Sequence, residues 1–124
     1  MDEKMSNDLE LFLQRVRSGD AIEFDETISL IDLHYRYVPM RFTNGVGTDQ
    51  VVSEAGTNVG SLKIFSFASE QCLTEAQTLQ LFGKYYRDDV LGHPEGNDHQ
   101  NIRTFIRHGW SGIHFDGHAL VAKD

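Results

Sequence analysis

The sequence predicts an α+β fold, a mainly helical single domain with about five helices and a small antiparallel sheet of roughly two or three short strands. Apolar side chains recur at helical spacing in several segments that begin at capping residues or end at glycines. The patterns of residues 36–42 and 113–120 instead indicate strands. Strands and helices do not alternate along the chain, which disfavours a parallel Rossmann-type sheet. The 124 residues are enough for one domain, 1–124, with one core.

The N-terminal third predicts two amphipathic helices. Asn7 is a suitable N-cap for the first helix, with Glu10 three residues later, and Gly19 ends it. Its inner face is formed by Leu9, Phe12, Leu13 and Val16. The second helix is expected to begin after Phe24 or Asp25 and to run to about His34, with an inner face formed by Ile28, Ile31 and Tyr35.

A period of two from Arg36 to Phe42 predicts a strand, and Pro39 confines it to an edge because proline cannot donate to the ladder. Asn44 and Gly45 then form a turn. Residues 46–60 are expected to be a long loop that Val51 and Val52 anchor to the core.

Three helices are predicted in the second half. Ser61 caps a third helix with a shared apolar face of Ile64, Phe65, Ala68 and Cys72. The capping box from Thr74 to Gln77 opens a fourth helix, ended by Gly92, whose inward residues are Leu79, Phe82, Tyr86 and Val90. Asp98 caps a fifth helix, ended by Gly109, with a buried stripe of Ile102, Phe105 and Ile106.

The tail from Ile113 to Leu120 is expected to be a strand or hairpin, with Ile113 and Phe115 toward the core and a turn at Asp116 and Gly117. Cys72, the single cysteine, excludes an intramolecular disulfide and is expected to be buried.

The formal net charge of −8 opposes binding to nucleic acid or to an anionic membrane surface. The sequence contains no apolar run of 18 residues, and its acidic N-terminal segment has no signal-peptide core. We therefore expect synthesis as a soluble cytoplasmic protein.

Five of the six histidines fall in the last 32 residues, which raises the question of a metal site. Their spacings of six, nine, six and four place no two of them one turn apart on a predicted helix, so we expect no metal and no cofactor. The segment from Gly109 to Gly112 is one residue shorter than a nucleophile elbow and follows a helix. Adjacent Asp88 and Asp89 are interpreted as solvated surface groups, and no catalytic residue is assigned.

Two features remain as candidate sites. The glycine-rich segment from Gly56 to Lys63 leads into a helix N-terminus, which favours anions, although an ordinary capped helix explains it equally. His99, Arg103 and Arg107 form a basic stripe on the fifth helix, with Trp110 beside its end. The stripe is either a solvated face or a recognition surface for an acidic or phosphorylated partner.

Four segments resemble the HopJ (HopPmaJ) type III effector family: Tyr35 to Gly45, Gly56 to Phe65, Phe82 to Arg103 and Gly109 to Phe115. The similarity extends from about Asp8 to Leu120. It implies a protein delivered into a host cell by a type III system, and it brings no established catalytic residues. Such export generally uses a flexible, Ser-rich N-terminus, whereas here a short acidic segment leads into a predicted helix.

The sequence thus supports two functions and leaves open whether the chain is an enzyme. One is binding of a host or bacterial protein partner without a cofactor. The other is a small intracellular enzyme or an anion- or phosphometabolite-binding protein that uses the Gly56–Lys63 loop and the His99–Trp110 segment. Convergence of Asn44, Lys63, His99 and Arg103 on one closed pocket would favour the second function, and scatter over a convex surface the first.

Overall fold

The computed structural model describes the backbone of residues 3–123 and the side chains of residues 8–123. The order of elements is α1 (Glu3–Ser18), α2 (Phe24–His34), β1 (Tyr35–Tyr37), β2 (Phe42–Asn44), the 3₁₀ helix η1 (Gly47–Asp49), β3 (Val51–Ser53), α3 (Val59–Glu70), α4 (Glu75–Gln80), the π-helix η2 (Tyr85–Val90), α5 (Gln100–His108), the 3₁₀ helix η3 (Gly109–Gly112), β4 (His114–Phe115) and β5 (Leu120–Ala122). The predicted α+β class is confirmed.

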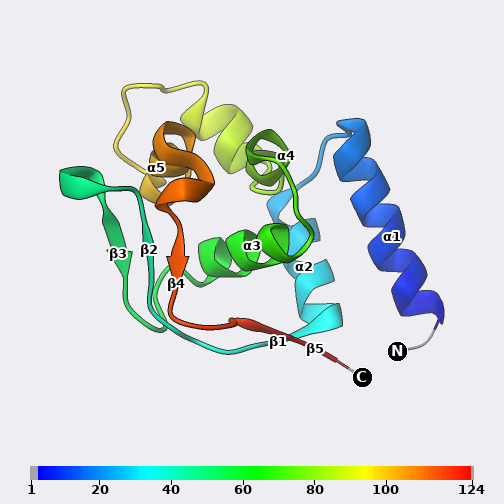
Figure 1. Ribbon diagram of the computed structural model, residues 1–124. Coiled ribbons are helices and arrows are strands. Elements are labelled where there is room, and N and C mark those ends of the chain that lie inside the picture. The colour runs from blue at the N-terminus through cyan, green and yellow to red at the C-terminus, as the bar shows by residue number, and fades with distance from the viewer. Residues whose placement is uncertain (1–2, 124) are drawn as a thin grey trace.

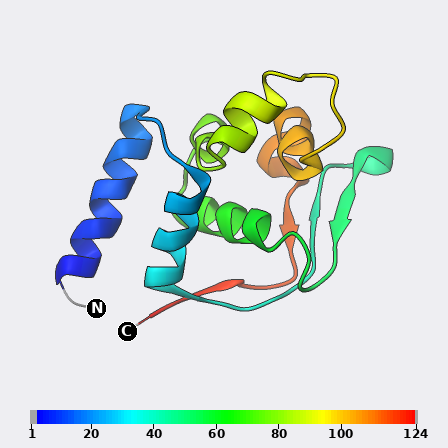
Figure 2. The same ribbon diagram turned by 180° about the vertical axis from the view of Figure 1, so that it is seen from behind.

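Helix α3 runs through the middle of the molecule, with α1 and α2 on one side, α4 and α5 above it, and the strands β2, β3 and β4 on the other side (Figures 1 and 2). Its sequence is apolar around most of its circumference, which is typical of a helix buried on all sides. Five of its side chains are fully buried: Leu62, Ile64, Phe65, Phe67 and Ala68.

Phe65 is the centre of an aromatic cluster that joins α3 to the elements around it. Its ring lies 5.0 Å from the ring of Phe105 and 5.5 Å from that of Phe82, measured between centroids. Phe42 and Trp110 complete the cluster at 6.3 and 6.4 Å. One core therefore fixes β2, α3, α5 and the segment after α4 relative to one another.

Two small antiparallel sheets replace the one sheet that the sequence predicts. Strands β3, β2 and β4 form a three-stranded sheet, in which Phe42 lies opposite both Ser53 and Phe115. Strands β1 and β5 form the other sheet, with Arg36 opposite Val121. The strand predicted from Arg36 to Phe42 is wrong as one element, because the backbone leaves the ladder around Pro39, which has no N–H to donate. The tail is likewise not a hairpin, since β4 and β5 pair with different strands.

The loop predicted for residues 46–60 contains strand β3 and a short 3₁₀ helix. Val52 is 44% exposed there and does not anchor the segment.

The second helix and the capping box at Thr74 are confirmed, and so are the ends of the first and fifth helices at Gly19 and Gly109. Helix α1 begins at Glu3, so Asn7 lies inside it, and the side chain of Asn7 is outside the described residues.

Two predicted N-caps are corrected. Asn58 rather than Ser61 precedes α3, and His99 rather than Asp98 precedes α5. Ile106, predicted to be buried, is 45% exposed.

The predicted fourth helix breaks at Gly83. This glycine has a φ of +61°, and a Cβ there would lie 2.6 Å from the backbone nitrogen of Phe24. The chain resumes as the π-helix η2, yet Leu79, Phe82 and Val90 still face the core as the spacing predicts. Cys72 lies past the end of α3 and is exposed, which corrects its predicted burial.

Candidate functional site

A pocket of about 370 Å³ lies where the N-terminal ends of α3 and α5 meet. Residues 99–102 line it from α5, and Asn58, Gly60 and Ser61 line it from α3. The remaining lining side chains are apolar or aromatic: Phe24, Val51, Phe82 and Tyr85. The pocket thus combines an aromatic wall with two helix ends.

Both helices begin at a residue in the left-handed backbone conformation, and neither residue caps its helix with its side chain. Asn58 has φ and ψ of 50° and 44°, and His99 has 50° and 49°. The Asn58 side chain instead donates to Ser53 Oγ at 2.8 Å. The first-turn N–H groups of both helices therefore lack a side-chain acceptor, and the positive ends of two helix dipoles border one pocket.

His99 is held by two neighbours from the π-helix. Its Nε2 lies 2.9 Å from Asp89 Oδ2, and its ring lies over that of Tyr85 with 5.0 Å between centroids. A non-glycine residue with positive φ costs free energy, so these contacts offset a strained backbone. π-Helices are rare and are often found at functional sites.

The contact with Asp89 indicates which ring nitrogen of His99 acts as the hydrogen-bond donor. An ionised carboxylate only accepts hydrogen bonds, so Nε2 carries the hydrogen and donates it. Nδ1 makes no hydrogen bond within the part of the chain that the structure describes, and it is not among the buried atoms without a partner. In the neutral ring with this tautomer, Nδ1 carries the lone pair and is accessible to water or to a ligand.

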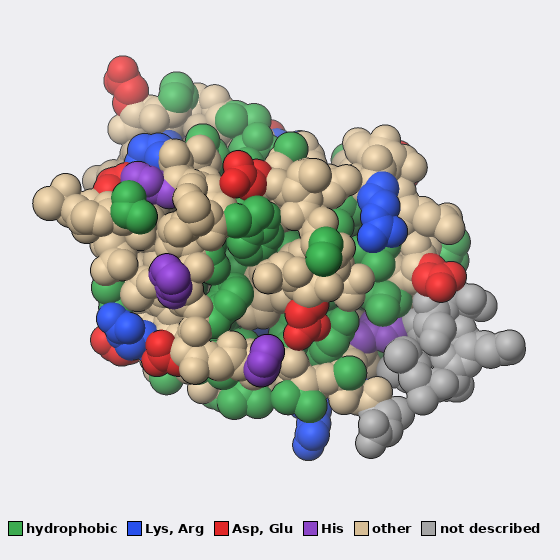
Figure 3. Space-filling view, viewed as in Figure 1, with side chains coloured by type: hydrophobic (Ala, Val, Ile, Leu, Met, Phe, Trp, Pro, Cys, Tyr) green, Lys and Arg blue, Asp and Glu red, His purple; other side chains and the backbone are tan. Residues whose placement is uncertain are grey.

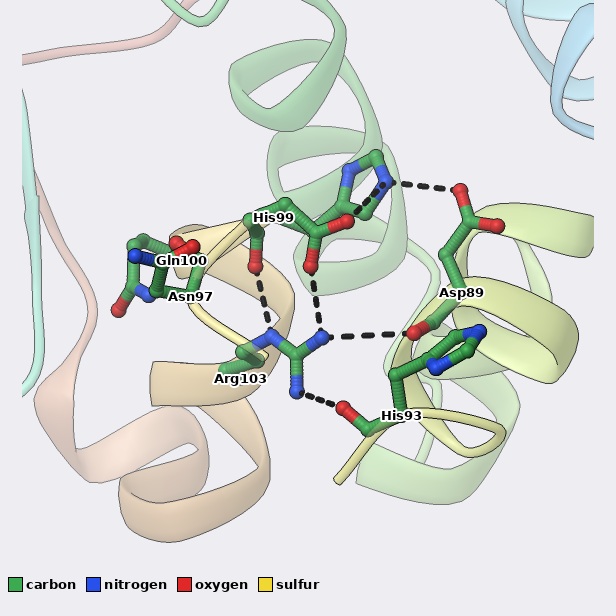
Figure 4. Close-up of polar contacts among 7 residues, drawn as sticks. Asp89, His93, Asn97, His99, Gln100 and Arg103 are labelled. Carbon is green, nitrogen blue, oxygen red and sulfur yellow. Dashed lines mark hydrogen bonds and ion pairs between the residues drawn. The ribbon is translucent and has the colours of Figure 1, made fainter. Parts of the chain in front are cut away.

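Arg103 fixes the segment that leads into α5, and its side chain is only 6% exposed (Figure 4). Its Nε donates to the Asp98 carbonyl at 2.7 Å, Nη1 to the His93 carbonyl at 2.8 Å, and Nη2 to Asp98 Oδ1 at 2.7 Å. The hydrogen bond from Arg103 holds the pKa of the Asp98 carboxyl below its ordinary value. Arg103 is thus a structural tie behind the pocket.

One group of described side chains has the spacing of a metal site. Ligand atoms of Asp89, Asp98 and His99 all lie within 4.8 Å of one another. The guanidinium of Arg103 already occupies one oxygen of Asp98, and its positive charge opposes a divalent cation. The sequence expectation of no metal missed this grouping because Asp89 was interpreted as a surface group.

The six site residues predicted from sequence do not converge on the pocket, so the convergence criterion does not by itself favour a ligand-binding function. His99 lines it directly. Asn44 is fully buried beside the pocket wall and donates to the carbonyl and side-chain oxygens of Asn101, at 2.8 and 3.0 Å. Lys63 is turned away to Asp32 Oδ1, 2.7 Å distant, and lies over the Tyr37 ring.

Two residues of the predicted basic stripe, Arg103 and Arg107, are paired with acidic side chains of the same chain. Arg107 pairs with Asp49 at 2.7 Å, and Arg103 is buried. Trp110 packs against Phe105 and donates from Nε1 to the Leu73 carbonyl at 3.2 Å. On the face drawn in Figure 3, the Lys and Arg side chains stand apart from one another. No continuous basic surface is seen on this face.

The predicted site residues do not include Asn58, Tyr85 and Asn101, which line the pocket, or Asp89, which contacts His99. Asn58 carried a usable signal, because asparagine tolerates the left-handed conformation and precedes the Gly60–Ser61 helix entry. Tyr85 and Asp89 depend on the π-helix, which no hydrophobic period indicates.

The chain matches the family model described as HopJ type III effector protein over residues 9–120. The chain belongs to this family. The solved crystal structure of the unknown function protein VPA0580 has a TM-score of 0.87 and 46% sequence identity, and the match covers 93% of each chain. No curated protein matches the sequence. Among the described residues, no helix is long and apolar enough to cross a membrane.

Proposed function

We propose that this protein binds a small molecule that presents an anionic or strongly hydrogen-bond-accepting oxygen group, such as a carboxylate or a phosphate. The observation that carries the proposal is the meeting of two helix N-termini, without side-chain caps, in one pocket. N–H groups at such ends point outward and favour negative charge. The aromatic wall adds surface for an apolar part of the same molecule.

The positive charge in this pocket does not depend on basic side chains. Lys63 and Arg107 are both paired elsewhere, so recognition would come from backbone N–H groups and from His99. Oriented backbone donors keep their direction without loss of side-chain entropy. This accounts for an acceptor-binding site in a chain with a net charge of −8.

Titration with inorganic phosphate and with acetate, followed by amide NMR, tests the proposal. Saturable shifts are expected at residues 59–61 and 100–102. The Ser61→Asp variant places a carboxylate in the first turn of α3, which favours the helix dipole while repelling an anion. Binding should weaken at least about tenfold, a loss of about 1.4 kcal/mol, with folding stability maintained.

Thr74→Asp is the matched control, because it adds the same charge at the N-cap of α4 and does not line the pocket. It should leave binding unchanged. Shifts that are absent, or that spread equally over the N-terminus of α4, would contradict the proposal.

A second candidate function is binding of a protein partner, supported by a groove between α1 and α2. Leu11 and Leu33 line it while 57% and 45% exposed. Carboxylates of Asp8 and Glu26 border the groove, and Glu26 pairs with Arg15. The complementary occupant is an amphipathic helix with an apolar face and basic flanks.

For a partner identified by crosslinking, Leu11→Ser with Leu33→Ser should abolish association. Leu91→Ser, a substitution at a leucine 55% exposed outside the groove, should not. An equal loss of association in the groove variant and in Leu91→Ser would mean that the partner does not bind in the groove.

Membership of the HopJ family supports delivery into a host cell by a type III system. The measurement is a translocation reporter fused to the N-terminal segment. A signal inside host cells is expected, and retention of the reporter in the bacterium would restrict the protein to the bacterial cytoplasm.

A further inference from the structure

The pocket also holds the parts of a proton-transfer site. His99 lines the pocket, Asp89 orients its ring from the π-helix, and Nδ1 is left accessible. A histidine oriented by a carboxylate is the usual arrangement of a general base. Two unusual backbone conformations, the left-handed His99 and the π-helix, are needed to bring this pair to the pocket.

We infer that the pocket hydrolyses small neutral acyl esters, with His99 as the catalytic base and Asp89 as its positioning residue. The inference rests on the proposed function, because the helix N–H groups that bind an acceptor oxygen would also stabilise the oxyanion of the reaction. A neutral ester presents its carbonyl oxygen to the helix ends, as the anionic group of a bound ligand does, and places no second charge near the carboxylates of Asp89 and Asp98 beside His99. Negative charge then develops only during the reaction.

The reaction begins when a water oxygen attacks the ester carbonyl carbon while His99 Nδ1 takes one proton from that water. The carbonyl electron pair moves onto oxygen, where the N–H groups at the helix ends stabilise it. When this tetrahedral intermediate collapses, the bond to the alkoxide breaks and the alkoxide takes the proton from Nδ1. One ester and one water yield one carboxylic acid and one alcohol, and the dyad returns to its starting state.

A second histidine–carboxylate pair in the described chain lies outside the pocket and so tests whether the pocket is needed for catalysis. His108 Nε2 lies 2.7 Å from Asp49 Oδ2, a contact like that of His99 with Asp89. His108 does not line the pocket, and Asp49 is shared with Arg107. The His108 pair therefore serves as an internal control.

The experiment measures hydrolysis of p-nitrophenyl acetate by the full chain and its variants. His99→Asn should reduce kcat/KM about 100-fold, because general base catalysis of this kind contributes at least that factor. Asparagine tolerates the left-handed conformation of residue 99, so the variant should fold. His93→Asn and His108→Asn should keep the rate, which separates pocket catalysis from ester cleavage by any exposed imidazole.

Asp89→Asn should lower kcat about tenfold with little change in KM, because ring orientation is lost while the pocket remains. Asp88→Asn alters the exposed neighbouring residue of the same π-helix and should have no effect. Equal rates in wild type and His99→Asn would overturn the inference, as would an acylated serine found by mass spectrometry. Acetate binding measured by NMR in the same proteins separates the two ideas, since binding without hydrolysis overturns only the catalytic one.

Discussion

Arg103 connects the loop before α5 to the helix through hydrogen bonds from all three guanidinium nitrogens. Three of its hydrogen bonds reach Asp98 and His93, and two of these end on backbone carbonyls. Gly96 lets the loop approach, since a Cβ there would lie 2.6 Å from Nη2. An ammonium group cannot reproduce this planar arrangement of donors.

Arg103→Lys is therefore expected to lower the free energy of unfolding by about 2–4 kcal/mol, because the buried guanidinium is replaced by a group that cannot make its hydrogen bonds to Asp98 and His93. Urea denaturation followed by circular dichroism measures the change. Arg107→Lys is the control at an exposed ion pair and should cost less than about 1 kcal/mol. Similar costs for the two variants would show that Arg103 is not a structural tie.

At the scale of elements, the junction between α4 and the π-helix depends on Gly83. Its φ of +61° and its approach to the backbone of Glu23 and Phe24 leave no room for a side chain. Gly83→Ala should destabilise the fold by about 2–4 kcal/mol through strain and backbone displacement. Because Phe24 and Tyr85 also line the pocket, ligand binding should weaken in the same variant.

Gly19→Ala separates conformational strain from crowding. Gly19 has a φ of +82°, but a Cβ there would meet nothing within 4 Å. Gly19→Ala should lower the free energy of unfolding by about 1 kcal/mol, because only backbone strain opposes the added Cβ. Thermal or urea unfolding measures the change. A cost equal to that of Gly83→Ala would remove crowding as the explanation.

Elements with a complete local signal could be predicted from the sequence. The capping box at Thr74 places the start of α4 correctly, and the apolar spacing in residues 24–34 places α2. The break at Gly83 could not be predicted, because it results from the approach of Phe24, nearly sixty residues earlier. For the site, the sequence indicated His99 and the Gly60–Ser61 helix entry. The contact of Asp89 with His99 could not be predicted, because it depends on the π-helix. The pairing of Lys63 with Asp32 could not be predicted either, because it depends on how α2 packs on α3.

At the scale of the whole molecule, several carboxyl groups have a lowered pKa. Arg15 lowers that of Glu26, Arg107 and His108 lower that of Asp49, and Arg103 lowers that of Asp98. A lowered pKa in the folded state gives stability that is present above the unfolded-state pKa. That stability is lost as the pH falls through the folded-state pKa.

Acid should therefore destabilise the protein below about pH 4, the ordinary range of carboxyl groups. Asp98→Asn keeps an acceptor for Arg103 but removes the ionisation, so the acid side of the stability curve should become shallower and stability at neutral pH should fall. Urea unfolding at a series of pH values measures both effects. An unchanged slope in the variant would mean that Asp98 does not contribute to acid sensitivity.

The pairing of β1 with β5 has a consequence for the order of folding during synthesis. Tyr35–Tyr37 leave the ribosome long before Leu120–Ala122, and in the described structure β5 is the strand that β1 pairs with. Until Leu120–Ala122 emerge, the hydrogen-bonding groups of β1 that pair with β5 are left to water. The helices of the nascent chain can pack while the edge of β1 is still unpaired. The sheet of β1 and β5 forms only after translation has passed residue 122.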